Sequence, residues 1–351
     1  MTHSSPLYDQ SRFESHAVRA AYLEAIRICE TLTEAGHQAF FAGGCVRDAL
    51  LGRQPKDFDV ATDATPDRVR EIFGRKKTLA FGASFGVIGV LPAASSRGDV
   101  KPEPTEVATF RSDGEYSDGR RPDQVHFGDA ENDALRRDFT INGLFFDPIR
   151  EEVIDYVGGQ SDLQRRCLRT IGEASQRFEE DKLRMLRAVR FATTLEFDLD
   201  PAVLREIQRR ADEIRLVSSE RIGAEMRRVM VAKGAVGGLR LLQETKLALV
   251  IFAELEHADL KLLERVFHFA PQRSFVGSLS LVCESIRHAD SSSDLNQVIE
   301  SLADQWRLSN EELRQVSAAL EYWSLVAESD QLAWSVVQPV LTHRDVEEIV
   351  A

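Results

Sequence analysis

Two aspartates separated by a single residue lie in the segment Lys56-Asp57-Phe58-Asp59-Val60. The pattern predicts a strand over residues 57–62, and side chains alternate between the two faces of a strand. Asp57 and Asp59 should therefore point the same way, while Phe58 points to the other face. Neighbouring carboxylates repel each other unless a cation lies between them, and hard oxygen ligands of this kind suit Mg²⁺. The pair is thus a candidate metal site.

A third carboxylate, Glu106, lies in a second predicted strand over residues 105–110, beside the apolar Val107. Such a set could serve two metal ions about 3.5–4 Å apart, one activating a hydroxyl and one holding a triphosphate during in-line phosphoryl transfer. An Asp-x-Asp pair alone also occurs by chance in solvated turns. The pair therefore needs support from a neighbouring element.

A glycine pair that precedes the aspartates gives that support. Gly43 and Gly44 separate a predicted strand over residues 38–41 from a predicted short helix over residues 46–51, which carries Arg47. Paired glycines let backbone N–H groups approach a phosphate at the positive end of a helix, and the arginine adds a cation. No Gly-Lys-Ser/Thr follows, so this is neither a Walker loop nor a dinucleotide fingerprint. Taken alone, the glycines would equally fit a structural turn.

The elements that must position these groups change character along the chain. Helices are predicted over residues 16–35 and 66–73, the second with Thr65 as its N-cap. Residues 79–91 predict one further strand. The polar residues 111–129 predict a loop, which at that length in a compact domain is either disordered or functional. The second half has helical periodicity, so the layout is an α+β head followed by an all-helical part.

Charge is distributed unevenly over the 351 residues, whose net charge is −13. Residues 160–230 hold 15 Lys/Arg against 13 Asp/Glu, a net of +2, and 14 of those 15 cations are arginines. Arginine pairs bidentately with phosphates and base edges, so a nucleic acid should bind there. The alternative is a solvated helical surface of mixed charge.

Composition excludes several other classes. No run approaches the roughly 18 apolar residues that a membrane helix needs, and the polar N-terminal residues lack an apolar signal core. The four cysteines lie far apart, without a CxxC pair or metal-ligand spacing. We therefore expect a cytoplasmic protein with reduced thiols and no membrane partner.

Three segments in fixed order resemble the class II tRNA nucleotidyltransferase/poly(A) polymerase family: GGCVRDALLGRQPKDFDVAT (43–62), RRDFTING (136–143) and EDKLRMLRAVRFA (180–192). The resemblance covers about residues 40–228. It implies a polymerase-β-like nucleotidyltransferase head with a small mixed β-sheet, followed by an all-helical neck, body and tail. We expect the head over residues 1–150, a neck with the nucleotide-selecting helix over 151–230, and a body and tail for RNA over 231–351.

The resemblance also implies roles for individual residues. Asp57 and Asp59 would be the metal ligands, with Glu106 as the third catalytic carboxylate and two Mg²⁺ ions as cofactors. The expected nucleotide contacts come from all three motifs: Gly43, Gly44, Arg47, Arg137, Asp138, Asp181, Arg184, Arg187 and Arg190.

Asp181 and Arg184 could select the base by their own chemistry. Three residues apart on a predicted helix, they would be neighbours, offering an acceptor beside a donor fork. Cytosine and adenine each present an amino donor next to a ring-nitrogen acceptor, whereas uracil and guanine place a carbonyl where the amino group lies. Each unpaired buried group would cost about 1–3 kcal/mol. The alternative is an ordinary ion pair on a helix surface.

Members of this family differ in what they add. The resemblance implies that switching from C to A needs the mobile loop after the third carboxylate strand, and residues 111–129 are intact rather than shortened, which disfavours a CC-only enzyme. The bacterial poly(A) polymerases that the chain resembles tend to carry a long basic C-terminal extension, whereas residues 231–351 are acidic and short, which disfavours that activity. The sequence thus predicts a template-independent enzyme that adds C and A to the 3′ end of tRNA from CTP and ATP, releasing pyrophosphate. The alternatives are a poly(A) polymerase, an A-only or CC-only enzyme, a small-molecule nucleotidyltransferase, and a catalytically silent RNA-binding protein.

Overall fold

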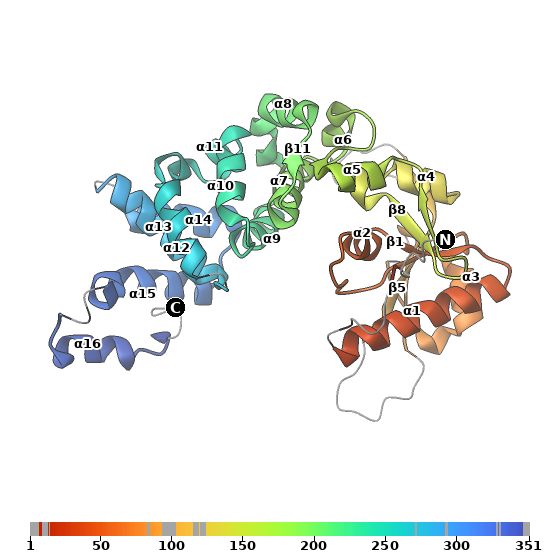
Figure 1. Cartoon of the computed structure of the whole chain (residues 1–351), viewed down its shortest axis with the longest axis horizontal. Helices are drawn as coiled ribbons and strands as arrows, with labels where there is room; N and C mark the ends of the chain where they lie inside the picture. Colours follow the sequence, from red (N-terminus) through yellow and green to blue (C-terminus); the bar gives the residue numbers. More distant parts are fainter. Residues whose placement is uncertain are drawn as a thin grey trace, which may run out of the picture. The chain divides into compact units, whose positions relative to one another are not determined.

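The computed structural model describes residues 7–8, 13, 15–82, 85–92, 103–114, 119, 124–270, 272–291, 294–327, 329 and 331–346. The chain divides into two compact units, Met1–Asp181 and Lys182–Ala351. In its described part, the first unit combines a sheet with helices, and the second is helical except for a two-residue strand, β11 (Asp198–Leu199). Figure 1 shows both units, and together they confirm the predicted α+β head with a helical continuation.

The first unit is built on a seven-stranded mixed sheet in the order β3-β4-β5-β2-β1-β8-β9. Only the β2–β5 pair is parallel. The strands are β1 (Ala39–Ala42), β2 (Val60–Thr62), β3 (Thr78–Gly82), β4 (Val87–Val90), β5 (Thr105–Thr109), β8 (Leu144–Asp147) and β9 (Glu152–Asp155). This arrangement confirms the small mixed sheet that the family resemblance implies.

The two faces of this sheet bury different side chains. On one face, Phe40, Ala61, Phe110 and Phe145 pack with the alanines of α4 (Ala130–Leu135). The opposite face is covered by α1 (His16–Glu34) and α3 (Pro66–Phe73), which lie together beside the strands in Figure 1. Since strand residues alternate between faces, each strand contributes to both layers of the core.

Several predicted elements are confirmed, and others differ from the prediction. Helix α3 begins at Pro66 with the Thr65 hydroxyl accepting from the Arg68 amide, as predicted. The single strand predicted over residues 79–91 is instead the β3–β4 hairpin, because Gly86 turns the chain with a φ of +82°. The predicted loop over 111–129 starts and ends as paired strands, β6 (Arg111–Asp113) and β7 (Val125–Phe127). Residues 115–118 and 120–123 of that loop lie outside the described residues.

The remaining helices lie mostly in the second half, where the sequence predicts helical periodicity. In the first unit they are α2 (Gly44–Leu50), α5 (Gly159–Arg165) and α6 (Ala174–Glu180), and β10 (Cys167–Leu168) is a two-residue strand. In the second they are α7 (Leu183–Leu195), α8 (Pro201–Arg210), α9 (Ser219–Met230), α10 (Ala235–Glu244), α11 (Ala248–Ile251), α12 (Leu260–Phe269), α13 (Phe275–Ala289), α14 (Leu295–Trp306), α15 (Asn310–Ala327) and α16 (Trp334–Leu341). Their core includes Trp306, whose ring packs edge-on against Phe252.

Two general expectations can be compared with the described residues. None of the helices there is both long and apolar enough to cross a membrane. All four cysteines are free thiols, as predicted. The three-part division at residues 150 and 230 stays a prediction.

Candidate active site

Asp57 and Asp59 lie just before β2 rather than within it. The predicted strand was wrong at this end because β1 stops at Ala42 and turns away at Gly43, leaving residues 57–59 without a full ladder partner. One bond remains, from the Ala42 amide to the Asp59 carbonyl oxygen, at 3.0 Å. The alternation of faces is as predicted, since both aspartates are exposed while Phe58 is buried.

Glu106 lies beside the aspartates. In the parallel β2–β5 pair, Val60 is opposite Val107, so Asp59 and Glu106 occupy matching positions one residue earlier. Crowding by protein atoms, and then the negative charges of Asp57 and Glu106, raise the pKa of Asp59 to about 7, while Arg137 acts in the opposite direction. The carboxylates of Asp57, Asp59 and Glu106 and the Arg137 guanidinium are therefore close enough to influence one another. They lie at the edge of the sheet face that packs against α4.

The carboxylates do not form a closed metal cage. Within the described ranges, no group of three or more His, Cys, Asp or Glu side chains is gathered closely enough to hold a metal ion by itself. Any ion bound by Asp57 and Asp59 would need further ligands from water or a bound molecule.

Gly43 and two arginines form a cationic cradle at the end of β1. Gly43 has a φ of +69°, and a Cβ built on it would lie 2.8 Å from Nη1 of Arg137. The Arg137 guanidinium donates to the Asn142 carbonyl oxygen at 3.1 Å, and Nη1 of Arg47 donates to the Asn142 side-chain oxygen at 2.8 Å. Gly44 begins α2, with no side-chain cap. Glycine is thus required at position 43 both for its backbone conformation and for the space that the guanidinium occupies.

Two anchoring residues of this cradle were missed from the sequence. Asp133, about 1 % exposed, accepts from Arg136 at 2.6 Å and from Arg137 at 2.9 Å, and these cations lower its pKa against the effect of burial. Asn142 is held in turn by Asp138, whose Oδ1 accepts from Nδ2 of Asn142 at 3.0 Å. Asp138 therefore positions the cradle in this structure. The only available signal was their position in or next to RRDFTING.

Asp181 and Arg184 are not one turn apart on a single helix, contrary to the prediction. Asp181 ends α6 with an extended backbone (φ −148°, ψ 110°), and α7 begins at Leu183. Both side chains are largely buried, each about 9 % exposed. No proline or glycine marks this break. The helical periodicity of the sequence continues across it, and for this reason a single helix was predicted.

The arginines further along α7 are held by a buried acid. Glu225 of α9, about 3 % exposed, accepts from Nε of Arg190 at 2.7 Å and lies 3.9 Å from Nη1 of Arg187. Both guanidinium groups also lie over the ring of Phe191. Arg187 and Arg190, two of the expected nucleotide contacts, are therefore fixed and partly neutralised within the helical unit. Glu225 was missed because only folding brings α9 to α7.

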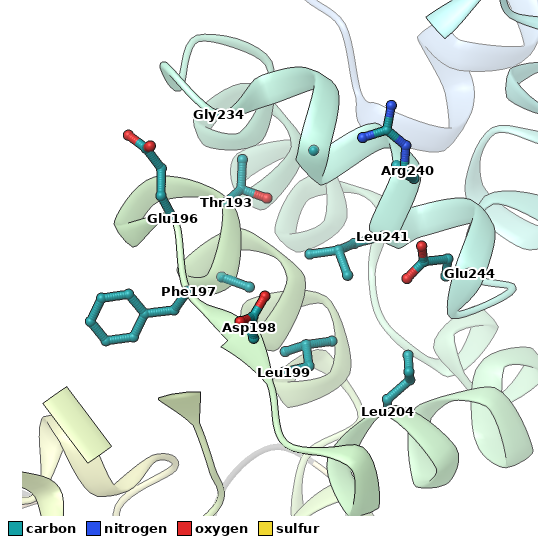
Figure 2. Close-up of a pocket in the computed structure, with 12 residues that line it drawn as sticks. Thr193, Glu196, Phe197, Asp198, Leu199, Leu204, Gly234, Arg240, Leu241 and Glu244 are labelled. Atoms are coloured by element: carbon teal, nitrogen blue, oxygen red, sulfur yellow. The ribbon is translucent and has the colours of Figure 1, made fainter. Parts of the chain in front are cut away.

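A cavity of about 420 Å³ in the helical unit contains none of the predicted site residues. It lies between the end of α7, β11, α8 and α10, and Figure 2 shows Asp198 and Glu244 on opposite sides of Leu199 and Leu241. Three acids and one arginine line it, so its net charge of −2 would repel a triphosphate. The lining residues are Ala192, Thr193, Glu196, Phe197, Asp198, Leu199, Leu204, Gly234, Gly237, Arg240, Leu241 and Glu244.

Known proteins share both units. Residues 39–169 match the family described as "Poly A polymerase head domain", and residues 196–259 match "Probable RNA and SrmB- binding site of polymerase A". A CCA-adding enzyme of Bacillus pumilus (strain SAFR-032) is 36 % identical over 302 residues, which are 86 % of this chain and 71 % of that protein. A crystal structure of the Bacillus stearothermophilus CCA-adding enzyme in complex with CTP is 30 % identical, with a TM-score of 0.75, over 94 % of this chain and 77 % of that one.

A second similar structure extends the likeness of the fold. The Thermotoga maritima CCA-adding enzyme complexed with tRNA has a TM-score of 0.66 at 18 % identity, covering 97 % of this chain and 79 % of that one. Carboxylates and a cationic cradle on a mixed sheet, together with these relatives, lead to one assignment: the chain belongs to the family of CCA-adding enzymes and is a nucleotidyltransferase with a poly(A)-polymerase-type head.

Proposed function

We propose that this protein adds C and A to the 3′ end of tRNA, without a template, using CTP and ATP and releasing pyrophosphate. The observation that carries the proposal is the convergence of Asp57, Asp59 and Glu106 beside Arg137, at the edge of one sheet face. The similarity to CCA-adding enzymes, including one in complex with CTP, supports this choice of nucleotides. We also propose that the protein works in the cytoplasm, where tRNA is processed.

The donor set fits a divalent cation. Asp57 and Asp59 offer hard oxygen ligands, and the raised pKa of Asp59 reflects first its desolvation by surrounding protein atoms and then repulsion from Asp57 and Glu106, which a cation would relieve. We propose that two Mg²⁺ ions bind here and that Asp57 and Asp59 would be their protein ligands. When bound, Mg²⁺ supplies charge neutralisation at the triphosphate and activation of the attacking hydroxyl.

Other residues of the first unit would bind and orient the triphosphate. Arg47 and Arg137, fixed on Asn142, would orient the triphosphate over Gly43 and Gly44. The 3′-hydroxyl oxygen of the RNA would then form a bond to the α-phosphorus, and the bond to the pyrophosphate oxygen would break. Pre-organised guanidinium groups stabilise the charge that develops on those oxygens.

Asp181 and Arg184 would select the base. An acceptor and a donor fork together match the edges of cytosine and adenine but oppose the carbonyl of uracil or guanine. This role does not need the two residues on one helix, only both groups at the base edge. Arg187 and Arg190, held by Glu225, would support the nucleotide from α7.

The deciding experiment is nucleotide addition to three tRNA transcripts, ending before CCA, after C and after CC. Each transcript is incubated with Mg²⁺ and one labelled nucleoside triphosphate at a time, and then with CTP and ATP together. Growth to CCA followed by a stop is the expected result. Arrest at CC, addition of A alone, or a lengthening A tail on unrelated RNA would each replace the proposal by another activity of the family. No incorporation on any acceptor would overturn it.

A further inference from the structure

The catalytic aspartates depend on an aromatic side chain from the segment that precedes α1. Residues 57–59 lie outside the β2 ladder, so hydrogen bonds of the sheet do not fix them fully. Besides the backbone bonds of Asp59 with Ala42 and the Cys45 thiol, Phe58 anchors them: its ring is about 4 % exposed, whereas both aspartates are exposed. The orientation of Asp57 and Asp59 is therefore set by how the Phe58 ring is packed.

Four aromatic rings surround Phe58 on this side of the sheet. Tyr22 of α1 and Phe41 of β1 have ring centroids 5.4 Å and 5.6 Å from it. The other two rings precede α1: Tyr8 lies 5.8 Å away and Phe13 lies 6.3 Å away. These separations are typical of favourable edge and tilted aromatic contacts.

The Tyr8 ring contacts three separate segments of the first unit. Besides Phe58, its ring lies 5.6 Å from Phe41 and 5.1 Å from Phe146. Phe41 is two residues before the Gly43 turn of the cationic cradle, and Phe146 is on β8, the neighbouring strand. Tyr8 thus bridges the aspartate segment, the cradle strand and its neighbour from the back of the sheet.

The ring of Tyr8, rather than its hydroxyl, makes these contacts. Tyr8 is about 6 % exposed; its hydroxyl makes no hydrogen bond of regular geometry in the described part of the chain, and its polar neighbour is the Cys45 thiol. Burial, and then the neighbouring Cys45 thiol, raise the pKa of Tyr8, so the group stays neutral. A phenyl ring should therefore replace it with little loss, since it keeps all the ring contacts.

We propose that Tyr8 is a positioning residue for nucleotide transfer, holding Asp57 and Asp59 in register with the cradle through its contacts with Phe58, Phe41 and Phe146. This inference rests on the proposed function for its catalytic consequence. The structural consequence, ordering of residues 56–60, is independent of what the enzyme transfers.

The test compares Tyr8→Phe and Tyr8→Ala with Leu32→Ala, a control that removes a fully buried side chain of α1. Hydrogen exchange of the metal-free full-length protein is followed by mass spectrometry in peptides covering residues 56–60. Tyr8→Ala should speed exchange there about tenfold or more, whereas Tyr8→Phe and Leu32→Ala should leave it near the parent rate.

Kinetics then separate positioning from general destabilisation. At a temperature where all variants are folded, Tyr8→Ala should lower kcat about tenfold and raise the Mg²⁺ concentration for half-maximal rate, with KM for CTP within about twofold of the parent. Tyr8→Phe should restore both parameters. Exchange and kcat in Tyr8→Ala equal to those of Leu32→Ala would overturn the inference. A parent that transfers no nucleotide would instead refute the proposed function, and the exchange comparison would still decide the role of Tyr8.

Discussion

At the residue scale, the proposed site separates catalysis from base selection, and two variants test that division. Asp59→Ala removes a proposed metal ligand, so it should abolish incorporation of every nucleotide. Asp181→Ala removes only the acceptor at the base edge, so C and A should still be added while discrimination against U and G falls by about tenfold or more. The measurement is the single-turnover rate with each of the four triphosphates. Equal losses of rate and selectivity in both variants would contradict the division.

The raised pKa of Asp59 predicts an unusual pH dependence of stability. An unfolded aspartate titrates near 3.9, whereas Asp59 titrates at about 7 in the folded, metal-free protein. Between these values the folded state keeps a proton that the unfolded state has released, so stability falls as pH rises through this window. Asp59→Asn removes the effect. The variant should therefore unfold at a higher temperature than the parent at pH 8 and at about the same temperature near pH 4.

Thermal unfolding in EDTA at pH 4, 6 and 8 measures this difference. Mg²⁺ added at pH 8 should stabilise the parent and narrow the gap, because the cation relieves the repulsion among the carboxylates. A parent that is more stable than Asp59→Asn at pH 8 in EDTA would show that the Asp59 carboxylate is not repelled in the folded protein.

Part of this site could be predicted from spacing and part could not. Alternation along a strand places Asp57 and Asp59 on one face even though the strand itself starts later, because extended backbone alternates with or without a ladder. Asp133 and Glu225 are different, since each anchors its arginines only after separate elements have packed. Nothing in the local sequence distinguishes such an acid from a solvated one.

At the element scale, local signals predicted the helix starts best. Thr65 with Pro66 fixes the start of α3, because both the cap and the proline act within one turn. The break after Asp181 has no such signal, and the β3–β4 hairpin depended on a single glycine inside an apolar run. Errors therefore fell where an element ends without a capping residue, or at a glycine that an apolar run conceals.

Two adjacent glycines of α10 test how closely α10 packs on α7. A Cβ on Gly238 would lie 2.4 Å from Oγ1 of Thr193, whereas a Cβ on Gly237 would meet nothing within 4 Å. Gly237→Ala should stabilise the protein by about 0.5–1 kcal/mol through helix propensity alone. Gly238→Ala gains the same propensity but forces the two helices apart, so it should destabilise by about 1–3 kcal/mol.

Urea unfolding of both variants beside the parent gives these free energies. Because the residues are neighbours on one helix, propensity and unfolded-state effects nearly cancel in the comparison. Equal stabilisation by both alanines would mean that α10 does not rest directly on α7 at Thr193.

At the scale of the whole molecule, the charge pattern matters more than the net charge of −13. The segment over residues 160–230 is the one region that is not acidic, yet at least ten of its fourteen arginines have a carboxylate oxygen within 4 Å. Composition alone predicted a phosphate-binding surface there. The structure shows that much of this positive charge is already paired within the protein.

This pairing predicts a weak salt dependence for RNA binding. Each phosphate neutralised by a cation contributes about 0.7–0.9 to the slope of log affinity against log salt, and paired arginines release fewer counterions because carboxylates already neutralise them. We expect a slope between about −2 and −4 for a tRNA transcript, measured from 50 to 300 mM KCl without nucleotide. Arg209→Gln, which removes an exposed arginine already paired with Glu206, should leave that slope unchanged. A slope steeper than about −6 would mean that the ion pairs open and that the arginines exchange their carboxylates for phosphates on binding.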